Sequence, residues 1–204
     1  MSKRGKRRLQ QQPSARRFQA IFLAGVTVVV ALYGAALWRG AHPPVPTVAF
    51  AGLVSTEGQE LEAGAFADRY KLVFFGFTEC AAVCPTTLVK LRSVLDTIEP
   101  RHRTLAPLFV SLDPEHDQPV VLKNYVQAFD GRIIGVTGDR QRIDRFAETL
   151  GAIVVRHPDA SGPFALDHSA RLYLLGPDNR LLSSYEADEA APAIASDILR
   201  QIPG

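Results

Sequence analysis

The chain has 204 residues, of which 47% are hydrophobic, so it is long and apolar enough for one ordinary domain and a short additional segment. Its net charge of +2 conceals an asymmetry, because the first 40 residues carry eight Lys or Arg and no Asp or Glu. The remainder has 15 basic against 21 acidic residues. A slightly acidic domain lacks the basic face that phosphate backbones require, so the composition argues against nucleic acid as a partner.

Residues 18–38 form an almost uninterrupted apolar run in which only Gln19 and Thr27 are polar. About 20 apolar residues suffice to cross a bilayer as a helix. Seven of the eight early basic residues precede the run, so the positive-inside rule places residues 1–17 in the cytoplasm and the rest of the chain across the membrane. The alternative is a cleaved signal peptide, but the run is long for a signal core, and no clean small-residue cleavage site follows it. We therefore predict an uncleaved membrane anchor at 18–38.

The remaining sequence predicts a linker and one domain. The linker, RGAHPPVPT at 39–47, is rich in proline and favours an extended conformation. Within 48–204, strands and helices alternate, which predicts an α/β fold with a central, mostly parallel sheet flanked by helices. In chain order, we expect two short strands around a turn at 55–58, strands at 71–77, 105–112, 132–137 and 153–156, helices at 85–97, 118–129 and 139–150, a hairpin of 169–175 with 181–185, and a final helix at 189–202.

The two cysteines, Cys80 and Cys84, lie where the strand 71–77 passes into the helix 85–97. A disulfide between them would close too short a loop to stabilise the fold much, even outside the cytoplasm. Four residues apart on a helical turn, the two side chains point the same way, and the positive end of the helix favours thiolates. The pair therefore indicates redox chemistry or a soft metal. Its C-x-x-x-C spacing departs from the C-x-x-C of thioredoxin-type disulfide oxidoreductases.

His168, directly before the strand 169–175, is the third candidate. In a thioredoxin-like layout its loop faces the cysteine-bearing turn, and two thiolates with one imidazole suit copper in either oxidation state, or zinc. Asp167 is interpreted either as an acceptor that orients the imidazole or as a turn cap. The other histidines lie in the linker or in loops and are interpreted as solvated: His42, His102, His116 and His157.

Three motifs resemble the Sco/SenC family of copper-handling proteins. They are FFGFTECAAVCPTTL at 74–88, VSLDPEHDQP at 110–119 and LDHSARLYLLGPDNRL at 166–181. The resemblance implies a thioredoxin-like fold and copper ligation by Cys80, Cys84 and His168. It also implies that the chain delivers copper to the binuclear CuA site of cytochrome c oxidase subunit II, or reduces the cysteines of that site. Glu79 replaces a His that is common in the family, and Ala81 and Ala82 replace a common Pro-Asp, but the three ligands are intact.

The leading hypothesis is thus a membrane-anchored copper metallochaperone rather than an enzyme with turnover. The alternative is a membrane-tethered thiol–disulfide oxidoreductase that uses a redox-active Cys80–Cys84 disulfide, and a third interpretation is a peroxidase-like redox sensor. Copper binding needs His168, whereas a reductase does not. The modest length favours a bacterial inner membrane with the domain in the periplasm over a mitochondrial inner membrane with the domain in the intermembrane space.

Overall fold

The structure is a computed structural model that describes residues 15–41, 47–98, 104–157 and 166–202. The chain divides into two compact units, Met1–Pro44 and Val45–Gly204. The first unit contains helix α1 (Ala15–Ala41), which includes the predicted run 18–38 and continues into the segment predicted as linker. Among the described residues, no helix is both long enough and apolar enough to cross a bilayer. The membrane anchor therefore stays a prediction.

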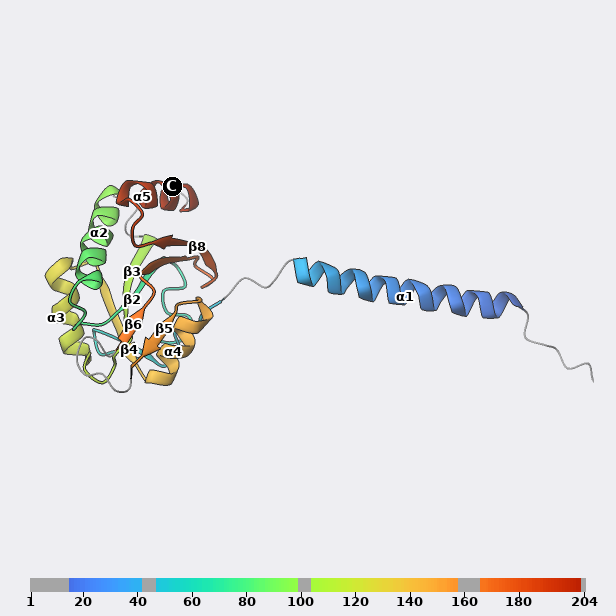
Figure 1. Cartoon of the computed structure of the whole chain (residues 1–204), viewed down its shortest axis with the longest axis horizontal. Coiled ribbons are helices and arrows are strands. Elements are labelled where there is room, and N and C mark those ends of the chain that lie inside the picture. The colour runs from blue at the N-terminus through green and yellow to red at the C-terminus, as the bar shows by residue number, and fades with distance from the viewer. Residues whose placement is uncertain (1–14, 42–46, 99–103, 158–165, 203–204) are drawn as a thin grey trace, which may run out of the picture. The chain divides into compact units, whose positions relative to one another are not determined.

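The second unit is built on a six-stranded sheet in the order β1-β4-β3-β2-β7-β8 (Figure 1). The predicted strands are confirmed to within a few residues, except that the second short strand after the turn 55–58 is only an isolated bridge of Glu60 with Val54. The sheet is mixed rather than mostly parallel. The three central strands run parallel, whereas β1 joins one edge antiparallel and the hairpin of β7 and β8 extends the other. The hairpin explains the antiparallel pairing of β7 with β8. The antiparallel pairs β1–β4 and β2–β7 join strands that are distant in sequence. The strands are β1 (Leu53–Ser55), β2 (Tyr70–Gly76), β3 (Leu105–Ser111), β4 (Ile134–Gly138), β7 (Arg171–Leu175) and β8 (Leu181–Glu186).

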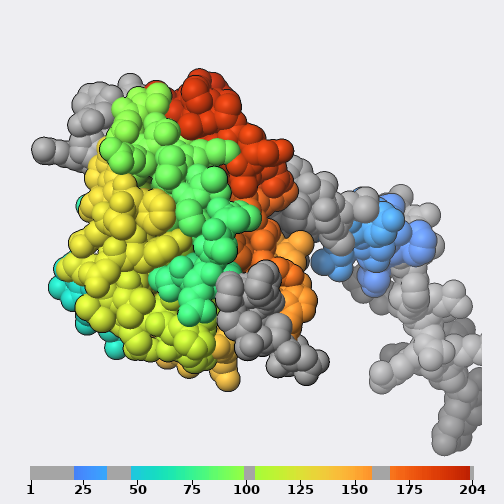
Figure 2. Space-filling model, turned by 60° about the vertical axis from the view of Figure 1, so that its left-hand side comes forward, coloured from blue at the N-terminus to red at the C-terminus, as the bar shows by residue number. Residues whose placement is uncertain are grey.

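Helices follow the three parallel strands, as the alternating pattern predicts, and one more follows the terminal hairpin. They are α2 (Val83–Thr97), α3 (Pro119–Phe129), α4 (Arg140–Thr149) and α5 (Ala191–Gln201). Asp139 caps α4, because its carboxylate accepts a hydrogen bond from the backbone N–H of Arg142 at 3.3 Å. On the face shown in Figure 2, α2 lies between α3 and α5, and it contacts both.

Strand β2 separates two hydrophobic cores and contributes to both. Leu72 and Phe74 pack into the core beneath α2, α3 and α5, while Val73 and Phe75 pack into the core that includes α4. This alternation follows from the two-residue period of a strand, and burial on both faces explains the continuous apolar run. The end of β2 is thus held firmly from both sides, and it is this end that leads into the cysteine-bearing turn.

Strands β5 (Val154–Arg156) and β6 (Leu166–His168) pair with each other in a second, two-stranded sheet that is separate from the six-stranded one. β5 was predicted, but the residues of β6 were predicted as loop. A three-residue strand with two polar side chains has no apolar run to reveal it, and only its pairing with β5, in which Val154 lies opposite His168, defines it. This pairing fixes the backbone of His168.

Candidate metal centre

The cysteines reach the site from a turn and from a helix, rather than from one helical turn as predicted. β2 ends at Gly76 and α2 begins at Val83, so Cys80 precedes the helix and only Cys84 lies within it. The backbone N–H of Cys84 donates to the Sγ atom of Cys80 at 3.3 Å. The first N–H groups of a helix have no partner within the helix, and the sulfur supplies one where the N-cap residue, Ala82, has no side-chain acceptor. The hydrogen bond therefore keeps the two cysteines adjacent.

Gly76 provides the space for the sulfur of Cys84. A Cβ atom at this position would lie 2.7 Å from the Sγ atom of Cys84 and 2.8 Å from the ring of Phe109. Both distances are too short for ordinary contacts, so any larger residue would displace the sulfur or the ring. The sequence interpretation did not single out Gly76, although an isolated glycine inside an apolar strand often marks such a close approach.

His168 points its Nε2 atom at the cysteines. This atom lies 3.5 Å from the Sγ atom of Cys84, while Nδ1 lies 3.1 Å from the carbonyl oxygen of Ser169. A carbonyl only accepts, so Nδ1 carries the proton and Nε2 keeps its lone pair for a ligand. The rings of Phe74 and Phe77 approach the imidazole edge-on at 6.2 and 6.0 Å. Burial lowers the pKa of His168, which favours the neutral ring that metal binding requires.

The three side chains form one group of potential ligands. The Sγ atoms of Cys80 and Cys84 and a ring nitrogen of His168 all lie within 4.8 Å of one another. Two soft sulfurs and one imidazole fit copper or zinc and suit hard cations poorly. Cys84 is fully buried, whereas Cys80 and His168 are each partly exposed.

The expectation that the helix end makes both cysteines thiolates is wrong for Cys84. Burial raises the pKa of the Cys84 thiol, and the neighbouring side chain of Cys80 raises it further. The cost of desolvating a thiolate thus exceeds the stabilisation from the helix N-terminus. A metal must therefore displace a proton from Cys84 when it binds, and its affinity should rise with pH.

Asp167 pairs with His157 and not with the imidazole of His168, for which it was considered as an acceptor. It is exposed, and its Oδ2 atom lies 2.8 Å from the Nε2 atom of His157 across the β5–β6 hairpin. The carbonyl of Ser169, rather than Asp167, accepts the hydrogen bond that orients the ring of His168. His116 is also exposed and bonds to Asp113 at 2.7 Å, whereas the two remaining histidines, His42 and His102, lie outside the described residues.

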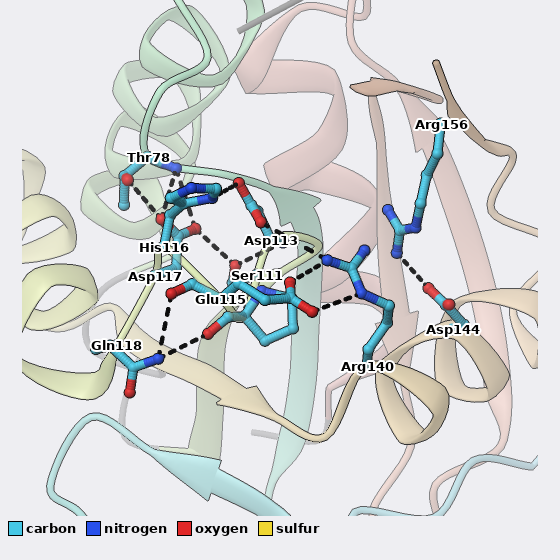
Figure 3. Close-up of polar contacts among 11 residues, drawn as sticks. Thr78, Ser111, Asp113, Glu115, His116, Asp117, Gln118, Arg140, Asp144 and Arg156 are labelled. Carbon is cyan, nitrogen blue, oxygen red and sulfur yellow. Dashed lines mark hydrogen bonds and ion pairs between the residues drawn. The ribbon is translucent and has the colours of Figure 1, made fainter. Parts of the chain in front are cut away.

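A buried carboxylate fixes the turn that carries Cys80 (Figure 3). Asp117 is 1% exposed and accepts hydrogen bonds from the backbone N–H of Thr78 at 3.1 Å, from the hydroxyl of Thr78, and from the hydroxyl of Ser111 at 2.6 Å. Burial nevertheless raises the pKa of Asp117. The network joins the segment after β2 to the end of β3. The sequence analysis identified the VSLDPEHDQP motif but gave this aspartate no role. Its hydrogen-bond partners lie 6 and 39 residues away in the sequence, so a local pattern does not reveal them.

The comparisons with known proteins agree with this geometry. The model of the SCO1/SenC family matches residues 47–203. The chain belongs to the SCO1/SenC family. The human mitochondrial SCO1 homolog is 32% identical over 149 residues, which make up 72% of this chain and 50% of the human protein. The chain thus spans about half the length of that relative.

Solved structures of family members have the same fold as this SCO1/SenC chain. The structure of ScoI from Bradyrhizobium japonicum with copper bound is 29% identical, has a TM-score of 0.65, and matches 74% of this chain and 96% of that one. Yeast Sco1 with copper bound is 26% identical, has a TM-score of 0.70, and matches 77% and 88%. The resemblance inferred from the three motifs is therefore confirmed, and with it the thioredoxin-like α/β fold.

Proposed function

We propose that this SCO1/SenC protein binds one copper ion through Cys80, Cys84 and His168 and hands it to an acceptor protein. The observation that carries the proposal is the convergence of the three ligand atoms within 4.8 Å. Two family members of the same fold are described with copper bound, which favours copper over zinc for the same donor set. Two thiolates suffice for Cu(I), and the imidazole adds the nitrogen donor that Cu(II) prefers.

We propose that the acceptor is the CuA site of cytochrome c oxidase subunit II and that this protein is anchored in a membrane. The choice of acceptor rests on the resemblance to a family of oxidase assembly proteins. The anchoring rests on the apolar run 18–38, on the basic residues before it, and on the exposed apolar side chains of α1 from Ile21 to Tyr33. A chaperone with these features would work at the outer face of a bacterial inner membrane or, alternatively, at the mitochondrial inner membrane.

A second function, thiol–disulfide exchange, is favoured by one observation. Cys80, in the turn before α2, and Cys84, in the first turn of α2, are free thiols, and the sulfur of Cys80 already accepts a hydrogen bond from the backbone of Cys84. Formation of a disulfide needs only a small movement, so the same pair is suited to reduce a partner's cysteines. His168 separates the two functions, because copper binding uses its imidazole and disulfide exchange does not.

Complementation tests the chaperone proposal. Wild-type protein, His168→Ala and Cys80→Ser are expressed in a strain that lacks its own oxidase assembly factor, and oxidase activity is measured. We expect wild type to restore activity and both variants to fail, while purified His168→Ala still forms the Cys80–Cys84 disulfide. If His168→Ala restores activity fully and Cys80→Ser does not, the oxidoreductase function replaces the chaperone.

A reporter fusion tests the anchor. Alkaline phosphatase folds actively only outside the cytoplasm, because its disulfides need oxidising conditions. Fused after Gly204 in a bacterial host, it should be active and remain in the membrane fraction. Activity in the soluble periplasmic fraction would indicate a cleaved signal peptide, and an inactive fusion would contradict the orientation.

A further inference from the structure

The strand pair β5–β6, which carries His168, is separate from the six-stranded sheet. Within the part of the chain that the structure describes, these two strands pair only with each other. Beside His168, the backbone N–H of Ser169 donates to the carbonyl oxygen of Ile153 at 2.9 Å. An isolated pair of strands is at best marginally stable in water, so its position depends on the side chains that dock it on the domain.

The apolar contacts of this strand pair are incomplete. Val154 and Leu166 pack against the core that includes α4, whereas the side chain of Val155 remains 44% exposed. A hollow of about 420 Å³ lies between β5 and α4, and its walls include Asp144 of α4 and Arg156 of β5. A strand that meets a helix across such a hollow gains less from hydrophobic burial than a fully packed one. Polar contacts therefore have a larger share in docking it.

An ion pair joins the two walls of the hollow (Figure 3). The Nη2 atom of Arg156 donates to the Oδ1 atom of Asp144 at 2.5 Å. The arginine side chain is only 29% exposed, so water screens the pair less than a fully exposed one. In the register of the strands, Arg156 lies opposite Leu166, two residues before His168. The ion pair thus acts on the short strand that ends in the imidazole.

Arg156 has no second carboxylate partner among the described residues. Its Nη1 atom is buried and forms no hydrogen bond with any of them. Without Asp144, the whole guanidinium group would therefore be partly buried and unpaired, and the strand would gain by moving outward until water reached it. Such a movement would carry His168 away from the cysteines.

We propose that Asp144 and Arg156 are positioning residues of the metal centre, because their ion pair docks β5–β6 on α4 and so holds the Nε2 atom of His168 toward the sulfurs. The copper part rests on the proposed function, whereas the docking does not. An imidazole that must first be brought back into place binds its metal less tightly. Two thiolates suffice for Cu(I), so the effect falls on Cu(II), which uses the nitrogen donor.

Asp144→Ala tests the proposal, since it removes the carboxylate and keeps a residue that favours the helix. Asp144→Glu retains the charge and is the conservative variant. Asp96→Ala is the matched control: it breaks an ion pair with Arg132, an arginine side chain that is likewise 29% exposed, at the end of α2 far from Cys84.

Three quantities are measured on the full-length protein in detergent. The first is backbone hydrogen exchange of the copper-free, reduced form, followed by mass spectrometry in peptides from β5, β6 and β2. The second is the affinity for Cu(II) and for Cu(I), each by competition with a chelator. The third is the thermal unfolding midpoint, which reports any loss of global stability.

We expect Asp144→Ala to exchange faster in β5 and β6 but not in β2, and to unfold near the temperature of wild type. Its Cu(II) affinity should fall about fivefold, the upper range for such an ion pair, while its Cu(I) affinity stays the same. Asp144→Glu should restore both the exchange and the Cu(II) affinity. Asp96→Ala should match wild type in exchange at β5 and β6 and in both affinities.

The proposal is wrong if Asp144→Ala exchanges like wild type in β5 and β6, or if it exchanges faster there and yet keeps its Cu(II) affinity. It is also wrong if Cu(I) and Cu(II) affinities fall equally, or if Asp96→Ala has the same effects, because either result indicates general damage. If wild type binds no copper, the proposed function fails, and hydrogen exchange alone decides whether the ion pair docks the strands.

Discussion

At the scale of single residues, each ligand of the proposed copper site is placed by a neighbour that is not itself a ligand. The backbone N–H of Cys84 holds the sulfur of Cys80, and the carbonyl of Ser169 selects the tautomer of His168. The absence of a side chain at Gly76 makes room for the sulfur of Cys84. Such neighbours determine affinity because a ligand that must first be reoriented binds its metal less tightly.

Gly76→Ala should therefore damage the site more than the fold. The new Cβ atom would lie 2.7 Å from the Sγ atom of Cys84, and overpacking of this kind costs about 1–3 kcal/mol. We expect a moderate loss in the free energy of unfolding by urea titration, together with a clear loss of Cu(I) affinity by chelator competition. Gly64→Ala, where a Cβ atom meets nothing within 4 Å, is the control and should change neither. Unaltered copper affinity in Gly76→Ala would show that the sulfur has room to move.

At the scale of elements, the site lies where the segments after β2 and β3 meet the end of β6. Asp117 connects the first two, because its carboxylate accepts hydrogen bonds from Thr78 and from Ser111. The pairing of β5 with β6 fixes the end of β6, which carries His168. Local sequence patterns predicted the long elements well, since β2 and α2 have the periodicities that burial imposes. They missed β6 and the network of Asp117, which depend on contacts between segments that are distant in sequence.

Asp117→Asn should loosen the turn that carries Cys80. The carboxylate of Asp117 has two oxygens and accepts hydrogen bonds from three donors, whereas an amide has a single acceptor oxygen. At least one buried donor therefore loses its partner in the variant, at a cost of about 1–3 kcal/mol. We expect lower stability in urea and weaker Cu(I) binding. Asp188→Asn, at an exposed carboxylate, is the control and should be nearly neutral. A variant as stable as wild type would mean that Asp117 is already protonated in the native protein.

At the scale of the whole molecule, the fold combines a polar site at one end of β2 with a buried charge at the other. Lys71 is completely buried, and its ammonium group donates to the carbonyls of Gly176 at 2.7 Å, Pro177 at 3.1 Å and Phe66 at 3.2 Å. These bonds tie β2 to the turn between β7 and β8. The class of fold followed from alternating strands and helices, but a lysine inside an apolar strand gave no indication of where its charge would be satisfied.

The stability of the protein should therefore depend on pH through Lys71. Burial lowers the pKa of Lys71 to about 8 in the folded state, against 10.5 for an exposed lysine. Between these values the unfolded chain binds more protons than the folded one, so the free energy of unfolding rises with pH, and this gain is lost as the pH falls through about 8. In urea titrations from pH 7 to pH 10, the difference between wild type and Lys71→Met should move in favour of wild type above pH 8. Parallel curves would contradict this.

The most direct test of the three-residue site is the copper content of the full-length protein purified anaerobically, with the thiols reduced or oxidised. We expect one Cu(I) per reduced chain, no tight binding by the form with a Cys80–Cys84 disulfide, and loss of tight binding in both Cys80→Ser and Cys84→Ser, because each change removes a soft ligand. Serine keeps the size of the side chain, so a loss reflects the sulfur. Stoichiometric loading of the oxidised form, or of either variant, would show that copper binds elsewhere on the chain.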